Sequence, residues 1–358
     1  MTEPLAPGAT IGILGGGQLG RMLSVAASRL GFKCHIYEPG AAPPAAQVAH
    51  ALTTAPYEDA AALSAFAASV DVVTYEFENI PTAALDLLEE AVPVRPGREA
   101  LRVSQDRLTE KEFLQGLGLA TAPFAPVASE AEMQQAIART GTPAILKTRR
   151  FGYDGKGQVR IDSTPDAGAA WAQLEPAPAI LEGFVAFSHE ISVIGARGMD
   201  GRVACFDPGE NVHEGGILRT TTVPARLSPA QRSDAVLIAA RILNALEYVG
   251  VLGVELFVTD DGLVVNEIAP RVHNSGHWTQ QGCTIDQFEQ HIRAIAGWPL
   301  GDGTRHADVE MTNLIGDDVA RIPDIAADGR SAIHLYGKAE ARPGRKMGHV
   351  NRITGKPG

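Results

Sequence analysis

A chain of 358 residues with 45% hydrophobic and 20% charged residues is longer than one compact core usually is, so two or three packed units are expected. Its three cysteines are an odd number at wide, irregular spacings, which argues against a disulfide framework and a paired-cysteine metal site. The net charge of -11 disfavours unspecific binding to nucleic acid or to an anionic membrane. With no basic-then-apolar leader and no apolar run of about 18 residues, we expect a cytoplasmic protein without a nucleic-acid or membrane partner.

The first hundred residues alternate apolar, strand-like runs with stretches of helical spacing. An apolar run over 11–14 is followed by a glycine turn and by apolar residues at helical spacing over 19–30. A further helical stretch after Asp59 leads into the strand-like run 70–75, and Pro81 opens another helix. This alternation predicts an α/β unit with a doubly wound parallel sheet.

The pattern changes near residue 107, where a polar helix start at Gln105–Arg107 precedes a differently organised region. Beyond it we predict a helix over 167–173 and strands over 144–148, 158–161, 179–181 and 190–195. Strands and helices no longer alternate regularly, so this part is predicted to be α+β, with a domain boundary near residue 107.

Gly15, Gly17 and Gly20 form a G-x-G-x-x-G pattern between the first strand and the first helix, and the acidic Glu38 follows at a suitable distance. This context is typical of a dinucleotide site, in which the pyrophosphate lies at the helix N-terminus. The same glycines also let a helix pack tightly on its strand, or bind another phosphate there. An NAD-dependent oxidoreductase is therefore one interpretation.

A second glycine-rich loop, 149–158, lies between two predicted strands and not between a strand and a helix. It is not a P-loop, because Lys156 lacks the following Ser or Thr. Its backbone amides and Lys156 would still cradle phosphates as a flap, with Lys147 as a second cation. A plain glycine-rich hairpin is the alternative.

Residues 251–269 form two apolar runs joined by a turn, which predicts a β-hairpin. If the loop is the three residues 260–262, Glu255 falls opposite Glu267 and both carboxylates point from one face. Opposed like charges about 5 Å apart destabilise a sheet unless a cation neutralises them, and Mg²⁺ prefers carboxylate oxygens. The alternative is a register shifted by one, which places the glutamates on different faces.

Two further segments suit ligand binding. The strand-like run 180–185 continues into a short apolar connector whose backbone groups are free to form hydrogen bonds, as a pocket for a nucleotide base requires. The loop 270–278 gathers cationic and polar side chains without helix or strand periodicity, which favours an anion-binding loop. Its His273 and His277 could instead suggest zinc, although no third ligand accompanies them.

Six motifs, taken together, carry a family resemblance over nearly the whole chain. The chain resembles the ATP-grasp superfamily, and within it the N5-carboxyaminoimidazole ribonucleotide synthetase family of purine biosynthesis. The motifs are Gly15–Arg21, Tyr75–Asn79, Gln105–Arg107, Phe151–Gln158, Asn266–Trp278 and Arg342–Lys346.

The resemblance implies a Rossmann-like pre-ATP-grasp domain over 1–107 and a two-lobed ATP-grasp fold. The central lobe with its glycine-rich flap would span 108–186, and the C-terminal lobe with the magnesium hairpin 187–358. Mg²⁺ would be held by Glu255 and Glu267. The residues implied to contact ATP are Arg107, Lys147, Gly152, Tyr153, Asp154, Gly155, Lys156, Gly157, Gln158, Glu182, Gly183, Phe184, Val185, Glu190, His213, Asn266 and Glu267.

The implied reaction is the ATP-dependent carboxylation of 5-aminoimidazole ribonucleotide with bicarbonate, through carboxyphosphate, giving ADP and phosphate. The implied catalytic residues are Asp154, Lys156 and Arg271, with Asp154 as the candidate proton acceptor. The residues implied to bind the ribonucleotide are Gly17, Gln18, Leu19, Glu76, Tyr153, Arg271, His273, Asn274, Lys338, Arg345 and Lys346.

The family also suggests a homodimer with small-molecule substrates. Three alternatives are open at this point. Another ATP-grasp ligase, such as a biotin carboxylase or a glycinamide ribonucleotide synthetase, would share the hairpin but differ over 271–278. An NAD-dependent oxidoreductase would use the first glycine motif, and a nucleotide-binding regulator would bind ATP without turnover.

Overall fold

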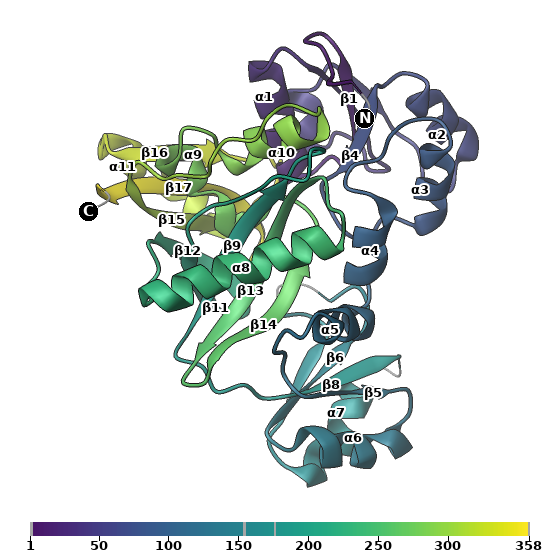
Figure 1. Ribbon diagram of the computed structural model, residues 1–358, viewed down its shortest axis with the longest axis vertical. Coiled ribbons are helices and arrows are strands. Elements are labelled where there is room, and N and C mark those ends of the chain that lie inside the picture. The colour runs from purple at the N-terminus through teal and green to yellow at the C-terminus, as the bar shows by residue number, and fades with distance from the viewer. Residues whose placement is uncertain (1–2, 153–154, 175–176, 357–358) are drawn as a thin grey trace.

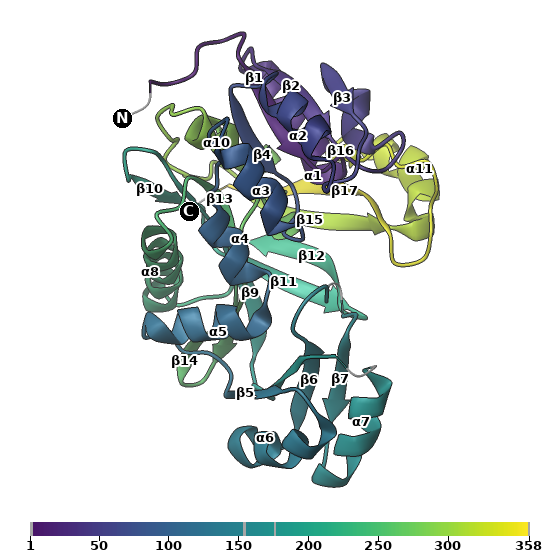
Figure 2. The same cartoon turned by 90° about the vertical axis from the view of Figure 1, so that its right-hand side faces the viewer.

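Three separate sheets follow one another along the chain in the computed structural model, which describes residues 3–152, 155–174 and 177–356 (Figure 1). We call them the N-terminal sheet, the central sheet and the large sheet. The central sheet and its helices form the lower part of the molecule in Figures 1 and 2, apart from the other two.

The N-terminal sheet is parallel, with the strand order β3-β2-β1-β4, as the alternating pattern predicts. Its strands and helices are β1 (Thr10–Leu14), α1 (Gln18–Arg29), β2 (Lys33–Tyr37), β3 (Ala51–Thr53), α2 (Ala60–Ala67), β4 (Val72–Tyr75), α3 (Thr82–Glu89) and α4 (Arg98–Ser104). The predicted helix starts are confirmed: Asp59 accepts a hydrogen bond from Ala62 N, and Pro81 precedes the first residue of α3.

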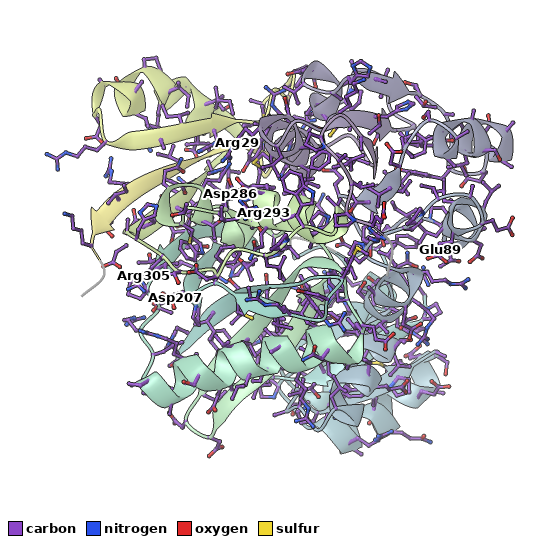
Figure 3. The ribbon with its side chains drawn as sticks, turned by 45° about the horizontal axis from the view of Figure 1, so that its top comes forward. Arg29, Glu89, Asp207, Asp286, Arg293 and Arg305 are labelled. Carbon is purple, nitrogen blue, oxygen red and sulfur yellow. The ribbon has the colours of Figure 1, made fainter. Side chains whose placement is uncertain are left out.

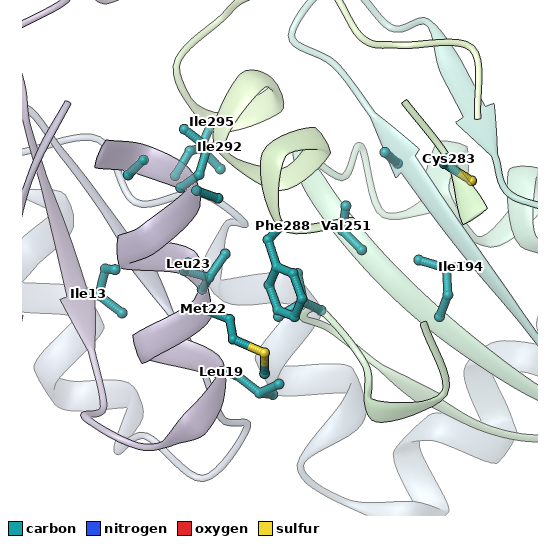
Figure 4. Packing of buried hydrophobic residues seen from close by; sticks show 14 of the residues in the cluster. Ile13, Leu19, Met22, Leu23, Ile194, Val251, Cys283, Phe288, Ile292 and Ile295 are labelled. Carbon is teal, nitrogen blue, oxygen red and sulfur yellow. The ribbon is translucent and has the colours of Figure 1, made fainter. Parts of the chain in front are cut away.

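Helix α1 joins the N-terminal sheet to the large sheet. Its apolar stripe, which includes Leu19 and Leu23, is buried in one cluster with Phe288 and Ile292 of α10 (Gln287–Ile295), as Figure 4 shows. Arg29 adds ion pairs of 3.1 Å to Asp286 and 3.0 Å to Glu289, two acidic residues at the start of α10. Figure 3 labels Arg29 and Asp286. Burial of each large apolar side chain contributes about 1.5–3 kcal/mol, so this shared core fixes the two units against each other.

The central sheet is antiparallel, with the order β5-β8-β6-β7 and a hydrophobic core of its own. Its elements are β5 (Phe124–Val127), α6 (Met133–Thr140), β6 (Ala144–Thr148), β7 (Gln158–Ile161), α7 (Ala167–Gln173) and β8 (Ala179–Gly183). Every strand and helix predicted between residues 144 and 181 is present. The second glycine-rich loop lies between β6 and β7, which pair directly.

Helix α5 (Arg107–Gly116) leads into the central sheet but packs elsewhere. Asp106 caps it by accepting from Leu108 N at 3.0 Å, which confirms the predicted helix start. Leu114 of α5 is buried in a cluster with residues of the large sheet, among them Val254 and Val265. Helix α5 therefore packs against the large sheet.

The large sheet has nine antiparallel strands, in the order β14-β13-β9-β11-β12-β15-β17-β16 with β10 beside β9. Helix α8 lies across one face of it, and α5 lies beside β14 (Figures 1 and 2). Its strands and helices are β9 (His189–Arg197), β10 (Val203–Cys205), β11 (Gly209–Glu214), β12 (Ile217–Val223), α8 (Pro229–Ala245), β13 (Gly250–Thr259), β14 (Gly262–Ala269), α9 (Thr279–Gly282), β15 (Asp308–Ile315), α11 (Ile322–Ala327), β16 (Ser331–Leu335) and β17 (Lys346–Gly355).

Short 3-10 helices connect these elements: η1 (Pro44–Gln47), η2 (Glu130–Glu132), η3 (Thr164–Asp166), η4 (Asn274–Gly276) and η5 (Gly316–Arg321). Within the described residues, no helix is both long and apolar enough to cross a membrane. The domain boundaries 1–107, 108–186 and 187–358 stay a proposal. The strands of the three sheets fall within them, although α5 packs on the large sheet.

Candidate active site

Glu255 of β13 pairs directly with Glu267 of β14, as the sequence predicts. The predicted three-residue loop is wrong, however. Thr259 pairs with Gly262, so the turn contains only Asp260 and Asp261. The first four pairs after this turn follow a register that would place Asn266 opposite Glu255. A β-bulge between the Leu256 and Glu255 pairs skips Asn266, and this extra residue brings Glu267 opposite Glu255.

The bulge also changes where two adjacent side chains point. Successive residues of a regular strand alternate between the two faces of the sheet. Asn266 and Glu267 nevertheless line the same cleft, together with Glu255 on the facing strand. The bulge therefore gathers three polar side chains on one face.

Arg107 on the first turn of α5 neutralises one glutamate of this pair. Its Nη1 lies 2.8 Å from Glu267 Oε2. Burial alone would raise the pKa of Glu267, but the charge and hydrogen bond of Arg107 outweigh burial, so that pKa lies well below its usual range. Burial and the charge of Glu267 raise the pKa of Glu255. The two facing carboxylates thus differ in their electrostatic surroundings.

Glu255 also belongs to a group of potential metal ligands. Among the described residues, the ligand atoms of Glu190, His213 and Glu255 all lie within 4.8 Å of one another. Glu267 stands outside this group because its carboxylate turns toward Arg107. Opposed carboxylates supply the oxygen ligands that Mg²⁺ prefers, and a cation beside them would offset the repulsion between the two charges. The residues therefore fit Mg²⁺.

A single cleft with a volume of about 670 Å³ connects these residues to all three units. The N-terminal sheet contributes the turn after β1 and the segment after β4. The central sheet contributes β6 and the glycine-rich loop, and the large sheet contributes the hairpin. Predicted site residues that line it are Gly17, Gln18, Leu19, Glu76, Arg107, Lys147, Gly152, Gly155, Lys156, Gln158, Phe184, Glu190, His213, Glu255, Asn266, Glu267, Arg271, His273, Asn274 and Lys346.

The glycine-rich loop covers this cleft from the central sheet. Gly155 has a φ of +75°, and a side chain there would come 3.3 Å from Gly216 Cα in the turn between β11 and β12. Lys156 beside it lines the cleft. The predicted residues Tyr153 and Asp154 lie outside the described residues.

A buried ion-pair chain supports the central side of the cleft. Glu182 Oε2 lies 3.0 Å from Lys147 Nζ and 3.4 Å from Lys111 Nζ. Burial alone would raise the pKa of Glu182, but the two ammonium groups outweigh it and lower that pKa. Of the described residues predicted to contact ATP, four adjoin the cleft wall and do not line it: Gly157, Glu182, Gly183 and Val185.

The backbone amides of the first glycine motif form hydrogen bonds with carboxylates of the protein itself. The Glu76 carboxylate accepts hydrogen bonds from Gly17 N and, at 2.7 Å, from Gly20 N, while Glu38 accepts from Gly16 N at 2.8 Å. These amides are the groups that a dinucleotide pyrophosphate would need. A carboxylate already satisfies them, so this geometry does not support the NAD interpretation.

The loop after β14 presents an arginine held by a carboxylate. Arg271 donates from Nε to Glu78 Oε2 at 2.6 Å and from Nη2 to Glu78 Oε1 at 3.2 Å. Burial alone would raise the pKa of Glu78, but Arg271 outweighs burial and lowers it. Such a two-point contact fixes the guanidinium plane at the cleft wall.

The neighbouring residues of this loop also face the cleft. Asn274 is buried, and both atoms of its amide lack a hydrogen-bond partner among the described residues. His273 Nε2 lies 3.4 Å from Glu255 Oε1, and its approach requires Gly253, where a side chain would come 2.9 Å from His273 Cβ. The buried amide of Asn274 therefore keeps unsatisfied hydrogen-bonding capacity at the cleft wall.

The two histidines of this loop do not form a zinc site together. His277 is fully buried, stacks on His349 with ring centroids 4.5 Å apart, and has Nδ1 3.0 Å from Gln287 Nε2. His273 points instead toward Glu255. Burial lowers the pKa of both histidines.

Family models match three successive parts of the chain. They are the ribonucleotide synthetase preATP-grasp domain over residues 8–105, the ATP-grasp domain over 112–288 and the phosphoribosylaminoimidazole carboxylase C-terminal domain over 310–356. An N5-carboxyaminoimidazole ribonucleotide synthase of Brucella melitensis biotype 1 is 56% identical over 352 residues, covering 98% of this chain and 97% of that protein. The chain belongs to the N5-carboxyaminoimidazole ribonucleotide synthase family.

Solved structures of this synthase family share the whole fold. An N5-carboxyaminoimidazole ribonucleotide synthetase in its ADP complex gives a TM-score of 0.96 at 42% identity, covering 99% of this chain and 94% of that one. A synthase from Aspergillus clavatus, solved with ADP and 5-aminoimidazole ribonucleotide, gives 0.90 at 32% identity, covering 98% and 95%. The predicted pre-ATP-grasp domain followed by an ATP-grasp fold is confirmed.

Two of the cationic residues expected in this synthase family, Lys338 and Arg345, are not among the described residues that line the cleft. Lys338 Nζ donates to Gln18 Oε1 at 2.5 Å and to Lys346 O at 2.6 Å, so it supports two residues that line the cleft. Arg345 Nη1 donates to Glu340 O at 3.0 Å. Lys346 itself faces the cleft.

Sequence reasoning gave no role to several residues that build this synthase site. Glu78 lies in the Tyr75–Asn79 motif but was not connected to Arg271. Phe257 stacks on Phe187 at the cleft wall, with ring centroids 4.6 Å apart. Phe257 follows Glu255 by two residues in the same strand, and this spacing predicts that both side chains lie on one face of the sheet. Lys111 follows Arg107 by one helical turn, which likewise predicts a shared face.

Proposed function

We propose that this chain is the ATP-dependent carbon-nitrogen ligase that carboxylates 5-aminoimidazole ribonucleotide. It joins bicarbonate to the exocyclic amine of the ribonucleotide and gives N5-carboxyaminoimidazole ribonucleotide, ADP and phosphate, a step of purine biosynthesis. Family membership supports this reaction, because proteins similar to this chain carry the name of its product in their own names.

The observation that carries the proposal is the continuity of the cleft. The hairpin glutamates lie in the same cavity as Arg271 and the turn Gly17–Leu19. A nucleotide at the hairpin and a ribonucleotide phosphate at the cations would then place their reacting groups in one enclosed space. Proximity of this kind is what a reaction between two activated substrates requires.

Nucleotide binding is assigned to the central side of the cleft. Phe257 and Phe187 offer an apolar surface to the base, and Phe184 lines the same cleft. Lys147 and Lys156 offer cations to the phosphates, with the backbone of the glycine-rich loop above them. Arg107 lies next to the hairpin and offers a third cation.

Ribonucleotide binding is assigned to the opposite end of the cleft. Arg271 and Lys346 supply positive charge for a phosphate, and the unpaired amide of Asn274 supplies both a donor and an acceptor. Gln18 lines the cleft as well. Tyr153 and Asp154 are proposed to complete it and lie outside the described residues.

Mg²⁺ is the proposed cofactor, with Glu255 and Glu267 as its protein ligands. Bound there, the cation would neutralise charge on the phosphates of ATP during transfer. The carboxylates themselves orient toward the cleft because the bulge at Asn266 places them on one face.

The chemistry then needs charge stabilisation and orientation more than a protein nucleophile. An oxygen of bicarbonate attacks the γ-phosphorus of ATP, the bond to the β-phosphate oxygen breaks, and ADP leaves. The amine attacks the carboxyl carbon of the resulting carboxyphosphate, phosphate leaves, and the amine loses a proton, for which Asp154 is the proposed acceptor. The cations of the cleft stabilise the charge that develops on the transferred groups.

Phosphate release from ATP tests this function. We expect it to require 5-aminoimidazole ribonucleotide, with labelled bicarbonate incorporated into an acid-labile product. Reactions that contain glycinamide ribonucleotide or biotin in its place control for another ATP-grasp ligase, and nicotinamide absorbance controls for an oxidoreductase. ATP binding without ribonucleotide-dependent phosphate release would identify a nucleotide-binding regulator and overturn the proposal.

We also propose a homodimer located in the cytoplasm. The family resemblance supports the dimer, and the intracellular supply of ATP supports the location. Sedimentation analysis of the purified chain at two concentrations tests the assembly, and a monomer at both would contradict it.

A further inference from the structure

Two adjacent residues of α5, Glu110 and Lys111, make contacts on both sides of Glu267. Lys111 Nζ donates to Asn266 O at 2.7 Å, and Glu110 Oε1 accepts from Ile268 N at 2.6 Å. These backbone groups belong to the residues immediately before and after Glu267. The helix therefore holds the main chain of β14 at the position of the bulge (Figure 1).

Asn266 is the residue that needs such support. It is the extra residue of the bulge and has no partner in the register with β13. A strand is least constrained where its ladder is interrupted. Lys111 provides a hydrogen-bond donor to the main chain there, and Glu110 provides an acceptor one residue beyond Glu267.

Both side chains are almost completely buried, with exposed fractions of 2% for Glu110 and 1% for Lys111. Lys111 Nζ lies 3.4 Å from Glu182 Oε2, so its charge is compensated. A buried ion pair that is replaced as a whole by apolar residues of similar volume often costs no stability, whereas removal of one partner alone destabilises the fold. Stability alone therefore gives no reason for a carboxyl group and an ammonium group at this contact.

We propose that Glu110 and Lys111 are positioning residues that fix the bulge at Asn266 and thereby aim Glu267 for the binding of magnesium with a nucleotide. This proposal rests on the proposed function, because it takes Glu255 and Glu267 as the ligands of Mg²⁺. Neither Glu110 nor Lys111 lines the cleft, among the residues described, so both act through the backbone of β14.

Calorimetric titration with ADP, in saturating Mg²⁺ and again with the metal chelated, tests the proposal. The variants are Lys111→Met and Glu110→Met, which remove the two contacts, and Glu110→Gln, which keeps an acceptor for Ile268 N. Glu112→Gln, at an exposed position of the same helix, is the matched control. Thermal unfolding of each variant reports the fold.

The gain in ADP affinity from Mg²⁺ is expected to fall by about 10- to 100-fold in Lys111→Met and Glu110→Met, as for other residues that orient metal ligands. Affinity without metal should stay near that of the parent, whereas the unfolding midpoint should fall in both Met variants, because each leaves a buried or half-buried backbone group of β14 without its partner. Glu110→Gln and Glu112→Gln should keep the full gain. A full gain in Lys111→Met overturns the inference, as does an equal loss in Glu110→Gln and Glu110→Met. Should Glu110→Met not fold, Lys111→Met decides. A parent chain without any effect of Mg²⁺ would instead contradict the magnesium site itself.

Discussion

Arg107 and Glu267 form an ion pair of 2.8 Å between the first turn of α5 and the hairpin of the large sheet, although 160 positions separate them in the chain. The pair keeps the Glu267 carboxylate ionised, because Arg107 outweighs the effect of burial on its pKa. Glu255, which faces it, lacks such a cation and has a raised pKa. A cation shared by the two carboxylates would remove this imbalance.

Glu267→Gln is expected to lower turnover by about 100-fold or more, the usual cost of removing one preorganised electrostatic group. The substitution keeps the size of the side chain, so the fold should persist. Steady-state phosphate release measures the effect, and Asp261→Asn in the exposed turn of the same hairpin is the control. Near-normal activity of Glu267→Gln would contradict its assignment to magnesium.

Glu78→Gln is expected to raise the KM for the ribonucleotide by about tenfold, because Arg271 loses the charged partner that orients it. The KM for ATP should change little, since the nucleotide is assigned to the other end of the cleft. Initial rates with each substrate varied in turn measure both values. Glu90→Gln, exposed just after α3, serves as control, and equal changes in both KM values would argue against the assignment.

Phe257→Ala should weaken nucleotide binding by about 3- to 10-fold, because the proposed base loses an aromatic contact, and such contacts contribute about 0.5–1.5 kcal/mol beyond their buried area. Equilibrium titration with ADP measures the dissociation constant. Leu237→Ala, at an exposed position of α8, removes apolar surface away from the cleft and should have no effect. An unchanged dissociation constant in Phe257→Ala would place the base elsewhere.

The folded protein is expected to lose stability in acid because of the buried His291. Burial lowers its pKa to about 3, whereas an unfolded histidine titrates near 6.5. Between these values the unfolded chain binds more protons, so the free energy of unfolding falls by about 1.4 kcal/mol per pH unit as the pH decreases below about 6.5. Protonation would also disrupt the hydrogen bond that Nδ1 accepts from Val251 N at 3.1 Å.

Urea unfolding at pH 7.5, 6.5 and 5.5 measures this dependence. His291→Gln does not titrate and should show a smaller loss between pH 6.5 and 5.5 than the parent chain. The buried His277 and His349, whose pKa values are also lowered, should keep part of the dependence in the variant. An identical loss in both chains would contradict the role of His291.

Much of the fold could be predicted because the signals are local. Apolar spacing and proline or acidic helix starts marked the elements of the N-terminal and central sheets, and the structure places α2, α3, α5 and α7 where those signals lie. The pairing of Glu255 with Glu267 was also predicted correctly, but the prediction assumed a three-residue loop that the structure does not have. A two-residue turn with a bulge and a three-residue loop give the same pair, and composition alone does not distinguish them.

The sequence by itself determined the order of the elements, the two glycine-rich turns and a hairpin that carries two glutamates, because backbone geometry and side-chain periodicity act over a few residues. Only the tertiary structure decided which partners those residues meet. Glu76 satisfies the amides of the first glycine turn, Arg107 reaches Glu267, and α5 holds the bulge at Asn266. Each contact joins segments more than 50 positions apart, and packing of whole elements, not local preference, brings them within hydrogen-bond distance.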